Sequence, residues 1–305
     1  MPSSSHTLKI KRRKFPKSEA RVISSINVKK TTNRLVSSFS VIYNHNEQIV
    51  RENLCYNMSM TKVNEERVQE IFNSISSDYD KMNAIISFKQ HDLWRAKTMK
   101  RMGDLTGLSI LDLCCGTGDW TFDLSESVGP SGKVIGLDFS ENMLEIAKAK
   151  LKEEAKKNIE FLQGNAMALP FENENFDVVT IGYGLRNTPD YLTVLKEIFR
   201  VLKPGGRVVC IETSHPTLPI YKQAFELYFK NVMPFFGKVF AKSLKEYQWL
   251  QKSAEDFPDA KTLEELFRKA GFVAVDYQKH GGGAIASHFA TKSKKPKSNI
   301  RIGKK

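Results

Sequence analysis

The fold is decided by one stretch, Leu111-Asp-Leu-Cys-Cys-Gly-Thr-Gly-Asp119, in which a short apolar run gives way to a glycine turn and then to a helical pattern. Glycines at such a strand-to-helix turn permit a tight backbone and the close approach of a ligand. The dinucleotide-binding fingerprint requires a third glycine, and Thr121 occupies its place. The glycine-rich phosphate loop that ends in Gly-Lys-Ser or Gly-Lys-Thr is also missing from the chain. The stretch therefore predicts a nucleoside site without a phosphate cradle.

The residues around this stretch alternate between apolar runs of strand length and segments with helical periodicity. Expected strands cover residues 109–114, 133–138, 159–163, 176–181, 207–212, 272–278 and 284–290. Expected helices cover residues 65–75, 90–103, 119–127, 141–156, 191–202 and 262–270. Strands that alternate with helices at this spacing predict an α/β fold, with a mostly parallel, doubly wound sheet between two layers of helices.

Residues 219–249 interrupt the alternation with nine aromatic side chains and a helical pattern that is broken by Pro234 and Gly237. Two interpretations carry equal weight. The segment is either a helical cap that packs on the core, or a lid over an apolar substrate.

A carboxylate at the end of the second expected strand supports the nucleoside hypothesis. Asp138 lies 20 residues after Gly118, where an acidic side chain can accept hydrogen bonds from both ribose hydroxyls. NAD and S-adenosylmethionine both carry this ribose, so Asp138 does not choose between them. Asp119, at the start of the next expected helix, would repel a phosphate.

The basic charge of the chain is concentrated at its two ends. The net charge is +13, but residues 1–59 carry +8 and residues 291–305 carry +7. Residues 60–290 hold 29 basic and 31 acidic side chains, a net charge of −2. A folded body that binds nucleic acid is expected to be basic, so we expect no nucleic-acid partner for this body.

Composition excludes several classes of protein. No uncharged apolar run approaches the ~18 to 20 residues that a membrane span requires. The four cysteines are too few for a disulfide scaffold, and their spacing suits no zinc site, so no metal is expected. We interpret the adjacent Cys114 and Cys115 as small packing residues rather than nucleophiles.

The two basic ends are expected to be disordered, and residues 60–290 to form a single domain. Three interpretations of residues 1–59 stay open. The favoured one is an upstream extension of the reading frame, because globular sequence begins directly after Met60. The others are an organelle transit peptide, since the segment is basic, Ser-rich and poor in acidic residues, and a functional tail. The tail 291–305 is basic and polar.

Longer motifs resemble the menaquinone/ubiquinone-biosynthesis C-methyltransferases, a family within the class I S-adenosylmethionine-dependent methyltransferases. They are LDLCCGTGDWT (111–121), GLDFSENML (136–144), GNAMALPF (164–171), VTIGYGLRN (179–187) and RVLKPGG (200–206). Further matches, at 79–80, 83–91, 236–243 and 247–251, are similar to the bacterial demethylmenaquinone branch. The resemblance spans residues 63–292 and implies a Rossmann-like, seven-stranded sheet.

The resemblance also implies the cofactor and the residues that contact it. The cofactor is S-adenosylmethionine, whose cationic sulfonium suits an acidic loop that lacks a phosphate cradle. The implied contacts are Asp112, Gly116, Thr117, Gly118, Asp138, Met143, Asn165 and Ala166, with Asn165 and Ala166 near the adenine. Ubiquinone-type members carry a serine where this chain has Gly182, so a hydroxyl contact there is missing.

The implied reaction adds a methyl group to a ring carbon of a polyprenyl naphthoquinol. The carbon becomes nucleophilic when the neighbouring hydroxyl loses its proton, so the enzyme needs a base near a phenol. Asp119 is the leading candidate, directly or through a water. Arg186 and Asn187, after the fourth expected strand, are candidates for binding the quinol oxygens, and Tyr79 and His288 are lesser ones.

Each candidate also has a structural interpretation. Asp119 is suited to cap its helix, and Arg186 to form an ion pair with Asp190. His288 in a terminal strand is more often a hydrogen-bonded polar residue than a catalytic one, and this holds more strongly for His91.

The function that we expect is methylation of demethylmenaquinol to menaquinol, the last step of menaquinone biosynthesis, in the cytoplasm or at the inner face of the membrane. Rival substrates are a ubiquinone-type benzoquinol, another small lipid and an RNA base. Rival classes are a nucleic-acid-binding protein that acts through its basic ends and an NAD-linked oxidoreductase. The basic ends are consistent with peripheral attraction to a membrane. The oligomeric state stays open, a homodimer included.

Overall fold

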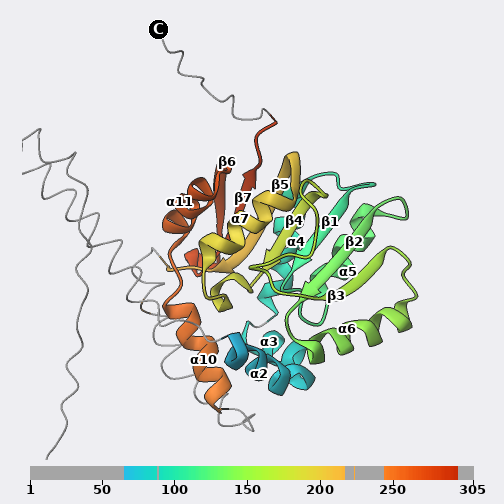
Figure 1. The fold of residues 1–305 in the computed structure, drawn as a ribbon. Helices are drawn as coiled ribbons and strands as arrows, with labels where there is room; N and C mark the ends of the chain where they lie inside the picture. The colour runs from blue at the N-terminus through green and yellow to red at the C-terminus, as the bar shows by residue number, and fades with distance from the viewer. Residues whose placement is uncertain (1–64, 88, 217–222, 224–243, 295–305) are drawn as a thin grey trace, which may run out of the picture. The chain divides into compact units, whose positions relative to one another are not determined.

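The computed structural model describes residues 65–87, 89–216, 223 and 244–294, all within the compact unit Lys62–Lys305 (Figure 1). Seven strands form one sheet in the order β3-β2-β1-β4-β5-β7-β6. Their bounds are β1 Ser109–Leu113, β2 Lys133–Asp138, β3 Ile159–Gln163, β4 Phe176–Gly182, β5 Leu202–Thr213, β6 Val273–His280 and β7 Ile285–Thr291. Strands β1 to β5 pair in parallel, and β7 pairs antiparallel to both β5 and β6. The predicted doubly wound, mostly parallel, seven-stranded sheet is confirmed.

The described helices are α2 Glu65–Ile75, α3 Tyr79–Ile86, α4 Gln90–Met102, α5 Asp119–Val128, α6 Glu141–Glu154, α7 Tyr191–Val201, α10 Leu244–Glu255 and α11 Ala260–Ala270. Several begin at a side chain that accepts hydrogen bonds from backbone amides of the first turn, which is the usual N-cap contact. Ser140 caps α6, Asp190 caps α7 and Asp259 caps α11. In the part of the chain that the structure describes, no helix is both long and apolar enough to cross a membrane.

The sequence missed one helix and underestimated one strand. Helix α3 lies in residues 79–86, where no element was expected. Strand β5 begins at Leu202 rather than at residue 207, because residues 202–206 still pair with neighbouring segments. Leu202 pairs with Phe176 of β4, and Gly205 donates a backbone hydrogen bond to Lys292.

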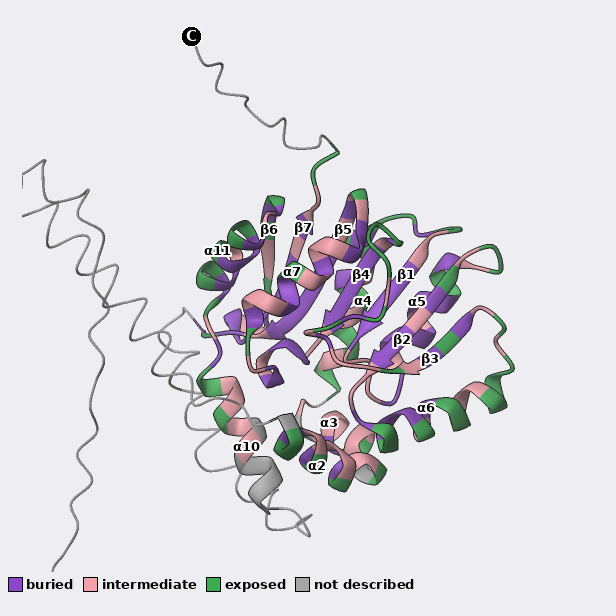
Figure 2. Cartoon of the chain, in the orientation of Figure 1, coloured by how far each residue is buried: buried purple, intermediate pink, exposed green. Residues whose placement is uncertain are grey.

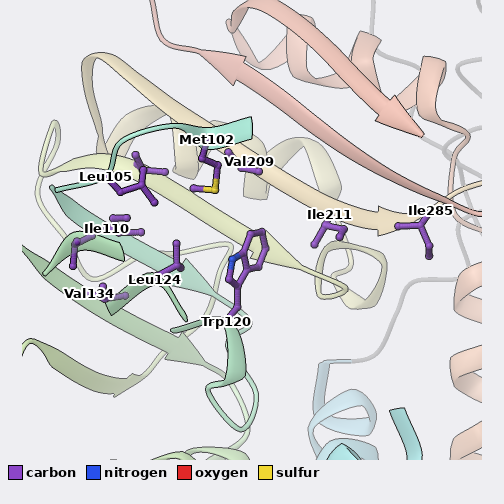
Figure 3. Packing of buried hydrophobic residues seen from close by; sticks show 11 residues of the cluster. Met102, Leu105, Ile110, Trp120, Leu124, Val134, Val209, Ile211 and Ile285 are labelled. Atoms are coloured by element: carbon purple, nitrogen blue, oxygen red, sulfur yellow. The ribbon is translucent and has the colours of Figure 1, made fainter. Parts of the chain in front are cut away.

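Helices cover both faces of the sheet (Figure 1). Helices α4 and α5 pack on one face, where Met102 and Trp120 join strand residues such as Ile211 in a buried cluster. Figure 3 shows the indole of Trp120 within this cluster. On the other face, the ring of Phe267 in α11 stacks on His288 of β7. Because successive strand residues point to opposite faces, the next residue, Phe289, packs against the first cluster.

Burial follows this layered arrangement (Figure 2). The central strands β1 and β4 are buried along most of their length, whereas α6 and α11 keep an exposed outer face. Most of the aromatic segment 219–249 lies outside the described residues, so the choice between core cap and lid stays a prediction. Residues 1–59 and 295–305 also lie outside them.

Candidate functional site

The candidate site lies where the direction of strand order reverses. From β1 the sheet continues through β2 and β3 on one side and through β4 and β5 on the other. The loops that leave neighbouring strands at such a point separate, and ligands of open α/β sheets bind in the resulting crevice. Four loops contribute here, residues 114–118 after β1, 139–140 after β2, 164–166 after β3 and 183–189 after β4.

The glycine loop after β1 turns through left-handed backbone conformations. The φ angles are 54° at Cys114, 56° at Gly116 and 89° at Gly118. Gly118 precedes α5 as its N-cap residue, and a Cβ atom there would lie 2.8 Å from the ring of Phe161. Asp119 is therefore the first residue of α5 and not its cap, so the capping interpretation of Asp119 is wrong.

Asp138 ties the glycine loop to the loop after β2. Its Oδ2 accepts a hydrogen bond from the Gly116 amide (2.8 Å), and its Oδ1 accepts one from the Ser140 amide (2.8 Å). Burial raises the pKa of Asp138, although backbone hydrogen bonds, those of Ser140 and Gly116 among them, act in the opposite direction. The carboxylate is thus held in a fixed orientation at the carboxyl end of β2.

Asp112 lies within strand β1 rather than in the glycine loop. Its side chain is almost fully buried in β1, where it accepts hydrogen bonds from Thr180 of β4 (2.6 Å) and Thr121 of α5 (2.7 Å). Burial raises the pKa of Asp112 to about 6, against the effect of these two hydroxyls. Asp112 therefore links three elements beneath the glycine loop.

A first pocket opens beside Asp138 and encloses about 740 Å³ of empty space, part of it open to solvent. Seven of the residues predicted from the sequence line it: Tyr79, Gly116, Asp138, Met143, Asn165, Ala166 and Asn187. Leu137 and Phe139 add apolar surface, and Val68 and Phe72 of α2 line it as well. Such a pocket, mostly apolar with a few convergent polar groups, is typical of a small-molecule site.

A second pocket adjoins the first and encloses about 610 Å³ of empty space, part of it open to solvent. The two pockets share five lining residues, Tyr79, Cys114, Gly116, Gly182 and Tyr183. Its further lining includes Asp112, Thr117 and Asp119 from the predicted set, and the ring of Trp120. Asn83, His91 and Arg95 come from the helices α3 and α4. The structure therefore brings together two adjoining pockets, which share Tyr79.

The pocket residues of α3 and α4 are the functional candidates that the sequence missed or discounted. Arg95 binds Asp123 of α5 through its Nε (2.6 Å), and His91 Nδ1 lies 2.6 Å from Ser87 Oγ. Burial lowers the pKa of His91, although the nearby Asp92 acts in the opposite direction. The motif at 83–91 includes Asn83 and His91 but gives them no role, and no quoted motif includes Arg95, because its place at the pocket follows from how the helices pack.

Arg186 faces Glu212 rather than the pockets. Its Nη1 donates to Glu212 Oε1 (2.6 Å) and to the carbonyl of Tyr183 (2.7 Å), and neither pocket includes Arg186 in its lining. The predicted pairing of Arg186 with Asp190 is wrong, because Asp190 accepts from the first amides of α7 instead. Asn187 donates to the same Tyr183 carbonyl (3.2 Å), while its buried Oδ1 has no partner among the described residues.

One other candidate, His288, is held by structural contacts. His288 is buried in β7, and its Nε2 lies 2.8 Å from the carbonyl of Ala260. Burial lowers the pKa of His288 to about 4, and the side chain lines neither pocket. Among the described residues, no group of three or more His, Cys, Asp or Glu side chains could hold a metal ion.

Comparison with known proteins agrees, along most of the chain, with the family resemblance of the sequence motifs. Residues 60–292 match the model of the ubiE/COQ5 methyltransferase family. The chain is 97% identical over 252 residues to a demethylmenaquinone methyltransferase from Lactococcus lactis subsp. lactis (strain IL1403), which covers 83% of this chain and 100% of that protein. It is 58% identical over 229 residues to a protein of the same name from Oceanobacillus iheyensis, which covers 75% of this chain and 96% of that protein.

Solved structures are similar in fold. An S-adenosylmethionine-dependent methyltransferase from Thermotoga maritima superposes with a TM-score of 0.53 at 22% identity, covering 74% of this chain and all of that one. A putative methyltransferase from Haloferax volcanii, solved with its Trm112 activator, gives a TM-score of 0.53 at 18% identity, covering 73% of this chain and 97% of that one. Strand order, glycine loop and family match agree, and the chain belongs to the ubiE/COQ5 methyltransferase family.

Proposed function

We propose that this protein transfers a methyl group from S-adenosylmethionine to a ring carbon of demethylmenaquinol, which gives menaquinol and completes menaquinone biosynthesis. The observation that carries the proposal is the 97% identity over the complete length of the Lactococcus lactis demethylmenaquinone methyltransferase. Two adjoining pockets support it, because methyl transfer requires that two molecules be held next to each other.

The first pocket fits S-adenosylmethionine. Asp138 offers a fixed carboxylate for the two ribose hydroxyls, and Leu137, Phe139 and Met143 form apolar surface for an adenine ring. The buried Oδ1 of Asn187, for which the described residues offer no hydrogen-bond partner, marks a polar position that a ligand amine can satisfy. When bound, S-adenosylmethionine supplies an electrophilic methyl group on a sulfonium sulfur.

We assign the first pocket contacts residue by residue. Gly116 leaves room for close approach of the ligand, and Asn165 and Ala166 bind at the adenine. Gly118 lines neither pocket, and its missing Cβ makes room for the ring of Phe161 instead. Asp112 and Thr117 stabilise the glycine loop rather than contact the ligand. The oxygens of Asp112 already accept hydrogen bonds from two hydroxyls, and the hydroxyl of Thr117 donates to Asp80.

The second pocket takes the quinol head group. Rings of Tyr79, Trp120 and Tyr183 offer aromatic surface for a flat naphthalene, and Asp119 contributes a carboxylate to the same lining. Asp119 removes the proton from the quinol hydroxyl, and the resulting phenolate makes the neighbouring carbon nucleophilic. The aromatic walls keep water away from the reacting groups.

Arg186 and Asn187 act on the loop after β4. Both donate to the carbonyl of Tyr183, a residue whose backbone has a φ of 55°. A non-glycine residue in this conformation is held by its surroundings, and such residues concentrate at functional sites. Arg186 and Asn187 therefore hold Tyr183 in its place between the two pockets, and a direct contact of Arg186 with a quinol oxygen stays a prediction.

We also propose that residues 60–290 act as one methyltransferase domain in the cytoplasm. The family match over residues 60–292 supports this extent. The basic segments 1–59 and 291–305 attract the protein to the inner face of the membrane, where a polyprenyl quinol resides.

The substitution Asp119→Asn tests the role of the base. It removes the proton acceptor and keeps the size of the side chain, so kcat with demethylmenaquinol should fall at least about 100-fold. Binding of S-adenosylmethionine, measured by calorimetry, should change little. The matched control is Glu126→Gln, an exposed acid on the same helix that pairs with Lys156, and it should leave kcat unchanged. Unchanged turnover in Asp119→Asn would show that another group is the base.

A further inference from the structure

Lys150 of α6 binds two carboxylates from two other helices. Its Nζ lies 2.8 Å from Asp119 Oδ1 of α5 and 2.8 Å from Asp80 Oδ2 of α3. Neither pocket includes Lys150 in its lining, whereas Asp119 lines the second pocket. The ammonium group therefore reaches the site only through its two partners.

The contact continues from Asp80 to the glycine loop. The other carboxylate oxygen, Asp80 Oδ1, accepts a hydrogen bond from the hydroxyl of Thr117 (2.6 Å), and Thr117 is buried. The residue before Asp80 is Tyr79, which lines both pockets. One chain of short contacts thus joins Asp119, Lys150, Asp80 and Thr117 across three helices and the loop.

The charges of this chain explain why a cation is needed. Asp80 and Asp119 are both within hydrogen-bonding distance of one ammonium, so without it two carboxylates would face each other. Partial burial lowers the pKa of Lys150, but its hydrogen bonds to Asp119 and Asp80 more than offset this and raise it overall. Lys150 therefore stays charged across the physiological range.

Helix α6 is also fixed to α2 through its first turn. Figure 1 shows the start of α6 close to α2. The Ser140 hydroxyl donates to Asn73 Oδ1 of α2 (2.6 Å), and Asn142 Nδ2 donates to the Asn73 carbonyl (3.1 Å). Lys150 lies farther along the same helix. The contacts that hold α2 against the first turn of α6 therefore do not involve Lys150.

We propose that Lys150 is a positioning residue for methyl transfer, which holds the Asp119 carboxylate in the orientation that accepts the quinol proton. The inference rests on the proposed role of Asp119 as the base. A small displacement of a catalytic group lowers the rate steeply, because the reacting atoms must meet in a narrow range of geometry. The side chain of Asp119 lies at the start of α5 and is 43% exposed. Such a side chain keeps one orientation only if a partner fixes it.

The test is a double-mutant cycle on the full chain with Lys150→Met, Asp119→Asn and the combined variant. Lys150→Met should lower kcat about 10- to 100-fold at saturating S-adenosylmethionine, while the Kd of S-adenosylmethionine changes less than about threefold. The combined variant should be no slower than Asp119→Asn alone, since Lys150 acts through Asp119. Lys148→Met makes the same change at an exposed position of α6 and should keep full activity.

Asp80→Asn separates orientation of the base from anchoring of α3. It weakens the contact to α3 and leaves the Lys150 to Asp119 pair, so its loss in kcat should be several-fold smaller than that of Lys150→Met. Unchanged kcat in Lys150→Met, or losses that multiply in the combined variant, would overturn the inference and leave the proposed function intact. Equal losses in Asp80→Asn and Lys150→Met would overturn it in favour of an anchor. Full activity of Asp119→Asn would overturn both the inference and the assignment of the base.

Discussion

At the scale of single residues, the site depends on positions that must stay small. Gly182 ends β4 between the two pockets, and a Cβ atom there would lie 2.9 Å from Cε3 and 3.1 Å from Cζ3 of the Trp120 indole. Trp120 is buried in the core cluster, so it has little room to move. The small size of Gly182 is therefore required by its neighbour Trp120.

Gly182→Ser should consequently reduce the free energy of unfolding by about 1 to 3 kcal/mol, the usual cost of overpacking a core. In a Trp120→Leu background the same change should cost clearly less, because the crowding ring is gone. Urea unfolding of the four proteins measures the coupling. An equal cost of Gly182→Ser in both backgrounds would contradict the steric explanation.

Residues in local motifs could be predicted from the sequence, and residues placed by packing could not. Gly116, Asp138 and Asn165 follow from strand ends and turn chemistry, and all three line the first pocket. By contrast, Arg95 and Lys150 lie on helices in which nothing local separates a site residue from a surface residue. Only the packing of α4 and α6 brings Arg95 to the second pocket and Lys150 to Asp119.

At the scale of elements, Asp112 joins β1 to β4 and α5 through two threonine hydroxyls. Burial raises its pKa to about 6 from an ordinary value of 3.8. An acid with a raised pKa in the folded state stabilises the fold below its unfolded pKa, and this contribution disappears as the pH rises through about 6.

Asp112→Asn should remove this dependence, because an amide can donate to one threonine and accept from the other without titrating. As the pH falls from 7 to 4, the wild type should gain about 2 kcal/mol in free energy of unfolding relative to the variant. Urea titrations at both pH values measure this difference, with Asp256→Asn as an exposed control. If the two proteins keep a constant difference, Asp112 does not titrate as described.

Long periodic elements were predictable, and short or pairing-dependent ones were not. The expected helix 191–202 corresponds to α7, whose apolar face recurs with helical period. Helix α3 has only eight residues, too few to reveal a period against its surroundings. The early start of β5 depends on pairing with β4 and with Lys292, a partner that lies far along the sequence.

At the scale of the whole molecule, charge separates a slightly acidic body from two basic ends. Residues 60–290 carry −2, whereas the ends carry +8 and +7. The net charge of +13 for the whole chain therefore describes neither the body nor the ends. The two pockets lie in the body, and we expect any attraction to anionic surfaces to come from the ends.

Truncation should test the role of the ends. Binding to vesicles that contain anionic lipid should decrease from the full chain to residues 60–305 and again to residues 60–291, by at most about 1 kcal/mol for each basic residue near the surface. Added salt should weaken the binding of the full chain most, because screening acts on exposed charges. Co-sedimentation measures the binding to vesicles. Equal binding by all three proteins would show that the ends do not attract the protein to the membrane.

The most direct test of the proposed function is substrate choice by the purified full chain. S-adenosylmethionine with a labelled methyl group is supplied together with either demethylmenaquinol or a ubiquinone-type benzoquinol precursor, and the labelled quinone is identified after extraction. We predict label in menaquinol, and a higher kcat/KM for demethylmenaquinol than for the benzoquinol. Absence of label from menaquinol, or a higher kcat/KM for the benzoquinol, would contradict the proposed function.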